Sequence, residues 1–192
     1  MVKRLLVCIT GSTGSVYGQR LLMAARESDE VETSLVITKS AKLVIAQELG
    51  IKSAELESLA DHVYNETNFM APIASGSYRL DATVIAPCSM KTLAGIAVSY
   101  EENLVVRAGS VALKEKWPLI LLVRETPLSV IHLKNMLTVA EAGGIIMPPL
   151  PPLYFGARTT EEQADLIAGR ILTMIGVKTS LKKEWGTDAE AV

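Results

Sequence analysis

The first predicted strand and the turn after it constrain the fold more than any other stretch of the sequence. Residues 5–9 read LLVCI, a short apolar run that is typical of a parallel strand buried on both faces. The next segment, GSTGS at 11–15, contains only small residues, and a helix is predicted to begin near Val16. Free backbone N–H groups at a helix start can hold an anion, and small side chains allow it to approach closely. On its own, this turn predicts a phosphate-binding site or a tight turn without a ligand about equally well.

The glycine spacing in this turn argues against a dinucleotide ligand. The pattern from Gly11 to Gly18 is GxxGxxxG, which lacks the GxG of the dinucleotide fingerprint. The second predicted strand, 31–37, is followed by Thr38, where an NAD-binding protein carries an acidic residue. The sequence therefore favours a mononucleotide.

Apolar runs and helical periodicity alternate along the chain. Strands are predicted at residues 5–9, 31–37, 82–86, 119–123 and 145–147. Helices are predicted at about 15–28, 40–48, from Cys88, at 102–116 and 128–142, and from Thr159 onward. In the second helix the residues predicted to face inward are Leu43, Val44 and Ala46. The segment 51–63 is predicted to be a helix or a surface loop.

This alternation predicts one domain over residues 1–192 with a polar C-terminal tail from about 178. The predicted fold class is α/β. The expected architecture is Rossmann-like or flavodoxin-like, doubly wound, with a mainly parallel sheet and helices on both faces.

Composition and charge exclude several classes of function. The net charge of −2 gives no basic field for nucleic acid, and no apolar stretch reaches the ~18 residues that a membrane span needs. The predicted strand begins at once, so no signal peptide is expected, and Cys8 and Cys88 are expected to be reduced thiols of a cytoplasmic protein. No metal-site spacing is present. The hydrophobic fraction of 49% leaves apolar surface for a homo-oligomer.

Further polar residues follow the predicted strands. Ser89 begins a second strand-to-helix turn, either as a plain N-cap or as part of a ligand site. Arg107 and Lys114 lie two helical turns apart and share a face, which is typical of a solvated edge or of an anion site. Arg124 and Glu125 follow the fourth strand in a Pro-bearing loop, a position that suits site residues.

Several of these motifs, taken together and in order, resemble the flavin prenyltransferases of the UbiX/Pad type. The resemblance covers nearly the whole chain and is carried by GSTGSVYG, SAKLVIAQE, MAPIASGS, PCSMKTLAGIA, the Arg107/Lys114 helix, PLILLVRETPLS, HLKNML, MPPLPPLYF and Trp185. It implies a flavodoxin-like fold that forms trimers and then a dodecamer, with FMN bound where subunits meet. The residues implied to hold FMN are Gly11, Ser12, Thr13, Thr38, Ser89, Met90, Lys91, Thr92 and Arg124.

The resemblance also implies an activity. Members of the family transfer a dimethylallyl group from dimethylallyl monophosphate to reduced FMN, adding a ring across N5 and C6 without a metal. The product is the cofactor of a UbiD-type decarboxylase, in ubiquinone biosynthesis or in aromatic acid decarboxylation. The sequence leaves open whether a monophosphate or a pyrophosphate donor is preferred. The residues implied to hold the prenyl phosphate are Phe69, Arg107, Lys114, Arg124, Tyr154 and Arg170.

The chemistry of prenyl transfer suits these residue types. Cations and a phenol can take up the charge that develops on the leaving phosphate, and an aromatic face such as that of Phe69 can stabilise an allyl cation. The residues implied to be catalytic are Thr13, Glu48, Lys114, Arg124 and Glu125. The sequence does not divide the proton-transfer and orienting roles between the two carboxylates. Thr13 stands where the family has serine, which keeps the hydroxyl.

Two alternatives remain on the same fold. One is an FMN-dependent cysteine-type decarboxylase, whose chemistry would need a histidine near the flavin, whereas neither His62 nor His132 falls in a predicted flavin-binding turn. HLKNML predicts a structural helix face for His132. The other alternative is a flavin carrier, which would need the two turns but not the cationic donor set.

Overall fold

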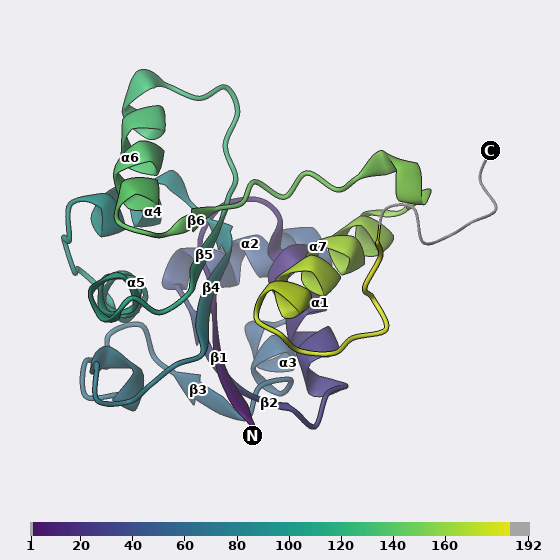
Figure 1. Ribbon diagram of the computed structural model, residues 1–192, viewed down its shortest axis with the longest axis horizontal. Helices are drawn as coiled ribbons and strands as arrows, with labels where there is room; N and C mark the ends of the chain where they lie inside the picture. The colour runs from purple at the N-terminus through teal and green to yellow at the C-terminus, as the bar shows by residue number, and fades with distance from the viewer. Residues whose placement is uncertain (1, 185–192) are drawn as a thin grey trace.

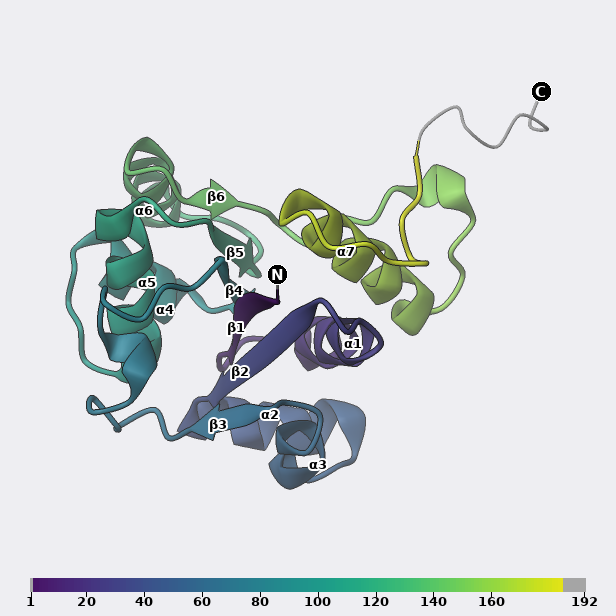
Figure 2. The same cartoon turned by 60° about the horizontal axis from the view of Figure 1, so that its bottom comes forward.

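The computed structural model describes residues 2–184, and they form a six-stranded, fully parallel sheet with helices on both faces (Figures 1 and 2). The strands are β1 (Lys3–Ile9), β2 (Val31–Ile37), β3 (His62–Tyr64), β4 (Ala82–Cys88), β5 (Leu119–Val123) and β6 (Ile145–Ile146). The strand order is β3-β2-β1-β4-β5-β6. The predicted fold class is therefore confirmed.

Seven α-helices and two short 3₁₀ turns connect these strands in the described residues. The helices are α1 (Ser15–Arg26), α2 (Lys39–Leu49), α3 (Ser53–Glu57), α4 (Met90–Ala97), α5 (Leu104–Glu115), α6 (Val130–Glu141) and α7 (Thr160–Met174). The 3₁₀ turns are η1 (Pro72–Ala74) and η2 (Leu153–Phe155). Trp185, which contributed to the family resemblance, lies outside the described residues.

Two apolar cores hold the helices against the sheet. Helices α1, α2, α3 and α7 cover one face, whereas α4, α5 and α6 cover the other (Figure 2). The central strands are buried on both sides because they consist almost entirely of aliphatic residues. Cys8 and Cys88 are free thiols in this interior, and burial raises the pKa of both well above the usual range. These two thiols are therefore unreactive packing groups.

Two local predictions need correction. The helix predicted within segment 51–63 is present as α3, but the edge strand β3 that follows it was missed, because HVY is too short and too polar to be recognised as a strand. In α2, Ala41 and Ile45 face the core, while Leu43 is 74% exposed and Ala46 is also exposed. Thr38 caps this helix, which begins at Lys39 rather than near residue 40.

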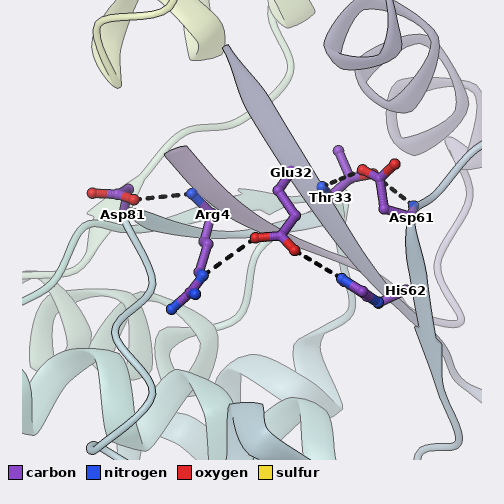
Figure 3. Close-up of polar contacts among 6 residues, drawn as sticks. All are labelled: Arg4, Glu32, Thr33, Asp61, His62 and Asp81. Atoms are coloured by element: carbon purple, nitrogen blue, oxygen red, sulfur yellow. Dashed lines mark hydrogen bonds and ion pairs between the residues drawn. The ribbon is translucent and has the colours of Figure 1, made fainter. Parts of the chain in front are cut away.

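Charged and hydroxyl side chains connect the amino ends of the strands (Figure 3). The Glu32 carboxylate lies between Arg4 Nε at 3.2 Å and His62 Nε2 at 2.9 Å, so it joins β1, β2 and β3. Asp81, just before β4, accepts a hydrogen bond from the backbone N–H of Arg4 at 2.9 Å. This end of the sheet is therefore held together by polar contacts and lies opposite the carboxyl ends, where ligands bind in such folds.

Asp61 fixes the start of the edge strand. One carboxylate oxygen accepts hydrogen bonds from the buried Thr33 N–H at 2.7 Å and from the Thr33 hydroxyl at 2.8 Å. The Thr33 N–H is the main reason that the pKa of Asp61 lies below the ordinary aspartate value of 3.8. A carboxyl group with a lowered pKa stabilises the fold above that ordinary value, and the contribution is lost as the pH falls through the folded-state pKa.

We expect Asp61→Asn to lower the unfolding free energy by about 1 kcal/mol at pH 7, because the Thr33 N–H loses a charged acceptor. The difference from wild type should shrink as the pH falls below 3.8. Urea titrations at pH 7 and pH 3 measure this difference in unfolding free energy. Asp29→Asn, in the exposed turn before β2, is the control and should change little at either pH. A loss of stability that is equal at both pH values would contradict this explanation.

Candidate functional site

The strand order places a topological switch point between β1 and β4, from which the chain winds outward in opposite directions. Thr10 follows β1 and is only 1% exposed. Its hydroxyl donates to the Pro87 carbonyl at 2.8 Å and accepts from the Ser89 N–H at 2.8 Å. This one side chain therefore ties together the carboxyl ends of the two central strands. The sequence analysis missed Thr10, although a hydroxyl directly after a buried strand was a usable signal.

The start of α1 is occupied by a carboxylate of the chain itself. Glu48, near the end of α2, accepts hydrogen bonds from the backbone N–H groups of Gly14 at 3.0 Å and Ser15 at 2.9 Å. Burial raises the pKa of Glu48, but hydrogen bonds from the Thr13 hydroxyl and from these N–H groups outweigh it, and the net pKa is lowered. The prediction of free N–H groups in the first turn was wrong at these two positions, because a residue 34 positions away supplies the anion.

Close packing explains the first glycine of this turn. A Cβ atom on Gly11 would lie 2.3 Å from Ser40 Oγ, so only glycine allows the turn to approach the start of α2. Thr38, the N-cap of α2, accepts a hydrogen bond from the Ala41 N–H and donates its own N–H to the Ile9 carbonyl. Ser12 Oγ is buried and has no hydrogen-bond partner within residues 2–184.

The start of α4 differs electrostatically from that of α1. Ser89 caps the helix by accepting from the Thr92 N–H, but the N–H groups of Met90 and Lys91 donate no hydrogen bond within the described chain. The Lys91 ammonium group pairs with Glu102 at 2.8 Å, which raises the pKa of Lys91. Lys91 therefore offers its backbone N–H at the switch point while its charge is used elsewhere. This second turn has open donors for an anion.

Arg124 joins the same edge of the sheet from β5. Its N–H donates to the Cys88 carbonyl at 3.2 Å. Burial raises the pKa of Tyr17, and the Arg124 charge partly opposes this, which places the guanidinium near α1. Glu125, the next residue, accepts from the Thr126 N–H at 3.0 Å within its own loop. All residues predicted to hold FMN thus lie at or beside the carboxyl edge of the sheet.

Residues predicted to hold the prenyl phosphate form two further groups. On α5, Arg107 donates to the Ala74 carbonyl of η1 at 2.9 Å and pairs with Glu101 at 2.9 Å, whereas Lys114 pairs with Glu115. Phe69 is 46% exposed in the loop before η1. Both cations of this group therefore already contact a carboxylate of their own chain.

The second of these groups lines a cavity beside α7. Tyr154, next to its edge-on neighbour Phe155, and Arg170 lie on the wall of a cavity of about 530 Å³. Helix α7 covers the face of the sheet opposite α5 (Figure 1). One chain therefore brings the FMN residues together but leaves the α5 group and the α7 group on opposite sides of the sheet.

Both histidines have structural contacts away from the switch point. His62 pairs with Glu32 at the amino end of β3 (Figure 3). His132 Nδ1 accepts from the Ser129 N–H and completes the cap of α6. Residues 2–184 contain no cluster of three His, Cys, Asp or Glu side chains that could hold a metal ion. Within the same residues, no helix is both long and apolar enough to cross a membrane.

The fold and the site define a flavoprotein: the Flavoprotein family model matches residues 2–171. The flavin prenyltransferase UbiX of Methanocaldococcus jannaschii is 44% identical over 184 residues, which cover 96% of this chain and 99% of that protein. AnUbiX (PadA1), solved in complex with FMN and dimethylallyl pyrophosphate, superposes with a TM-score of 0.93 at 41% identity over 97% of this chain and 98% of that one. The dodecameric FMN-dependent UbiX-like decarboxylase from Escherichia coli O157:H7 superposes with a TM-score of 0.91. It is 41% identical, and the match covers 95% of this chain and 98% of that one.

The chain belongs to the UbiX-type flavin prenyltransferases, and the family predicted from the sequence is confirmed. The relatives match it over nearly their whole length, so the shared family extends to the cavity beside α7 as well as to the sheet edge.

We expect Glu48→Gln to lower the unfolding free energy by about 1 kcal/mol at pH 7, because the N-terminus of α1 loses its negative charge. The difference from wild type should fall as the pH drops below 4.5, the ordinary glutamate value, since the pKa of Glu48 is lowered in the folded state. Denaturant titration measures both quantities. Glu141→Gln, at the exposed end of α6, is the control. Equal losses in the two variants would contradict a specific role for Glu48.

Proposed function

We propose that this chain is a flavin prenyltransferase that transfers a dimethylallyl group from dimethylallyl monophosphate to reduced FMN. The observation that carries the proposal is the electrostatic contrast at the switch point, where α4 presents open N–H groups and the Glu48 carboxylate of α2 occupies the start of α1. The start of α4 would bind the phosphate of FMN through Ser89, Met90, Lys91 and Thr92. The buried, unpartnered Ser12 hydroxyl fits a ligand with polar atoms over the first turn.

Thr13 and Glu48 have complementary roles in this proposal. The Glu48 carboxylate accepts a hydrogen bond from the Thr13 hydroxyl, which leaves the lone pairs of that oxygen to accept a hydrogen bond from an N–H of reduced FMN. A carboxylate in that position can also receive a proton released during ring formation.

The transfer balances without a metal or an oxidant. The C1–O bond of the donor breaks and its electron pair leaves with the phosphate oxygen, while N5 and C6 of reduced FMN form the two new bonds. The flavin gains one C5H8 unit, and one proton leaves with the inorganic phosphate. Tyr154, Arg170, Arg107, Lys114 and Arg124 would stabilise the charge that develops on the leaving phosphate. Phe69 offers an aromatic face to the allyl cation.

The separation of these residues within one chain favours a site shared between subunits. Arg107 and Lys114 lie on one face of the sheet and Arg170 on the other, so a single chain does not complete the donor set. A second copy supplying α5 residues would complete it, which fits the dodecamer reported for the Escherichia coli relative. We extend this to a homo-oligomer of this chain, with a UbiD-type decarboxylase as the recipient of its product.

A cysteine-type decarboxylase is the less favoured alternative. Such an enzyme would need a histidine near the flavin, and His62 lies at the amino ends of the strands, the edge opposite the switch point. His132 is engaged in the cap of α6. A flavin carrier would not require the cavity that Tyr154 and Arg170 line.

The deciding experiment is anaerobic incubation of the purified protein with reduced FMN and dimethylallyl monophosphate, followed by mass spectrometry of the released flavin. The expected result is a gain of one C5H8 unit. Arg170→Met should lower kcat/KM for the donor about tenfold or more while FMN affinity stays near wild type. Arg158→Met, an exposed change before α7, is the matched control. Unchanged flavin from a protein that binds FMN would refute the transferase proposal.

The apolar face of α6 provides a test of assembly. Val130, Leu133 and Leu137 are spaced for one helix face and are 67%, 51% and 57% exposed. Such a surface is typical of a subunit interface. We expect Leu133→Lys with Leu137→Lys to shift the protein to smaller species in light scattering coupled to gel filtration. Lys178→Glu, an exposed charge change outside α6, should leave the assembly unchanged, and an unchanged mass of the double variant would exclude this face.

A further inference from the structure

Two lysines near the C-terminus lie in the cavity beside α7 and belong to neither the predicted FMN set nor the predicted donor set. Lys182 and Lys183 line the same cavity of about 530 Å³ as Tyr154 and Arg170. Glu184 also lines it and forms an ion pair with Lys182. Three cations against one carboxylate give the lining a net charge of +2. Within residues 2–184, neither Arg170 nor Lys183 has an ion-pair partner, so this cavity favours an anion.

Backbone packing sets the position of the segment that carries these lysines. Val177 is buried after the end of α7, and Leu181 packs against the same core. A Cβ atom on Gly169 would lie 2.5 Å from the Leu181 carbonyl oxygen, so this glycine lets the segment lie directly on α7. The Leu181 N–H donates to Thr179 Oγ1 at 3.2 Å, which closes a turn just before the lysines. The chain therefore enters the cavity from a fixed backbone position.

We propose that Lys182 and Lys183 bind the phosphate end of the prenyl donor and determine whether a diphosphate donor is accepted, an inference that rests on the proposed function. A monophosphate ester carries roughly −1.5 to −2 charge at pH 7, which Tyr154 and Arg170 can contact. A diphosphate extends farther from the prenyl chain and adds negative charge that needs further cations. The lysine ammonium groups suit this task because each is a compact charge on a flexible stem. Gly169 is a positioning residue in this scheme, since it acts only through the segment that it supports.

The alternative source of anionic charge in this cavity is the phosphate of FMN. The open N–H groups at the start of α4 lie on the other side of the sheet from α7, beside Thr10 and Ser89. FMN bound at the switch point can place its phosphate there without reaching the lysines. If the lysines bind the donor, removing them lowers kcat/KM for the donor and leaves FMN affinity unchanged. If they bind the phosphate of FMN, removing them lowers FMN affinity instead.

The first test compares donors. In Lys182→Ala with Lys183→Ala, we expect kcat/KM for dimethylallyl diphosphate to fall about tenfold or more, kcat/KM for the monophosphate to fall less, and FMN affinity to stay unchanged. Lys182→Arg with Lys183→Arg should retain most of the wild-type ratio of the two kcat/KM values. Lys178→Ala, which lies outside the cavity lining, is the matched control. An unchanged ratio in the alanine variant, or a loss of FMN affinity instead, would overturn the proposal.

A second variant tests the positioning role. Gly169→Ala keeps every charge but forces the Leu181 backbone away from α7. We expect the diphosphate-to-monophosphate ratio of kcat/KM to fall as in the lysine variant, and the combined variant to show little further loss, because both changes remove the same contact. Additive losses would overturn the assignment of Gly169 as a positioning residue.

A binding measurement keeps the inference separate from the proposed activity. Calorimetry on the FMN-loaded wild-type protein measures its affinity for inorganic pyrophosphate. This affinity should be about tenfold lower in the lysine variant and unchanged in Lys178→Ala. If the wild type forms no C5H8 adduct with either donor, the proposed function fails, but this titration still decides whether the lysines form an anion site. Equal pyrophosphate affinities in the wild type and the lysine variant would overturn that site.

Discussion

The pairing of β1 with β4, which the hydroxyl of Thr10 extends past the strand ends, is the constraint on which the geometry of the site depends. By donating to Pro87 and accepting from Ser89, this hydroxyl helps to fix the carboxyl ends of β1 and β4 relative to each other inside a dry core. Helices α1 and α4 begin within a few residues of this contact and then diverge to opposite faces of the sheet. Any ligand over the switch point therefore lies beside two helix starts that this buried hydroxyl ties together beyond the end of the β1–β4 ladder.

These two helix starts differ in charge, so the two ends of the site suit different chemical groups. Glu48 neutralises the positive end of α1 and orients the Thr13 hydroxyl, so that side suits proton handling better than phosphate binding. The start of α4 keeps the N–H groups of Met90 and Lys91 open, so it suits an anion. A flavin mononucleotide, with a redox-active ring at one end and a phosphate at the other, matches such a polarity.

Sequence patterns predicted the sheet because its central strands are continuous aliphatic runs, and they missed β3 because HVY at a sheet edge carries too little apolar signal. The turns that follow buried strands could be identified as site segments, since the carboxyl ends of parallel strands meet at one edge. The contact between Glu48 and Gly14 could not be predicted, because it depends on how α2 packs beside α1. Nor does spacing reveal that α5 and α7 lie on opposite faces.

Charge pairing distinguishes the two halves of the proposed donor site. On α5, Arg107 and Lys114 are held by Glu101 and Glu115 in partly exposed ion pairs, which contribute about 0–1 kcal/mol each. A phosphate can displace such partners at little cost once a second subunit approaches. Arg170 has no such partner in the described chain. The α7 cavity therefore offers an anion an unpaired guanidinium within the described chain, whereas in the proposed oligomer the α5 half would need a second subunit to complete it.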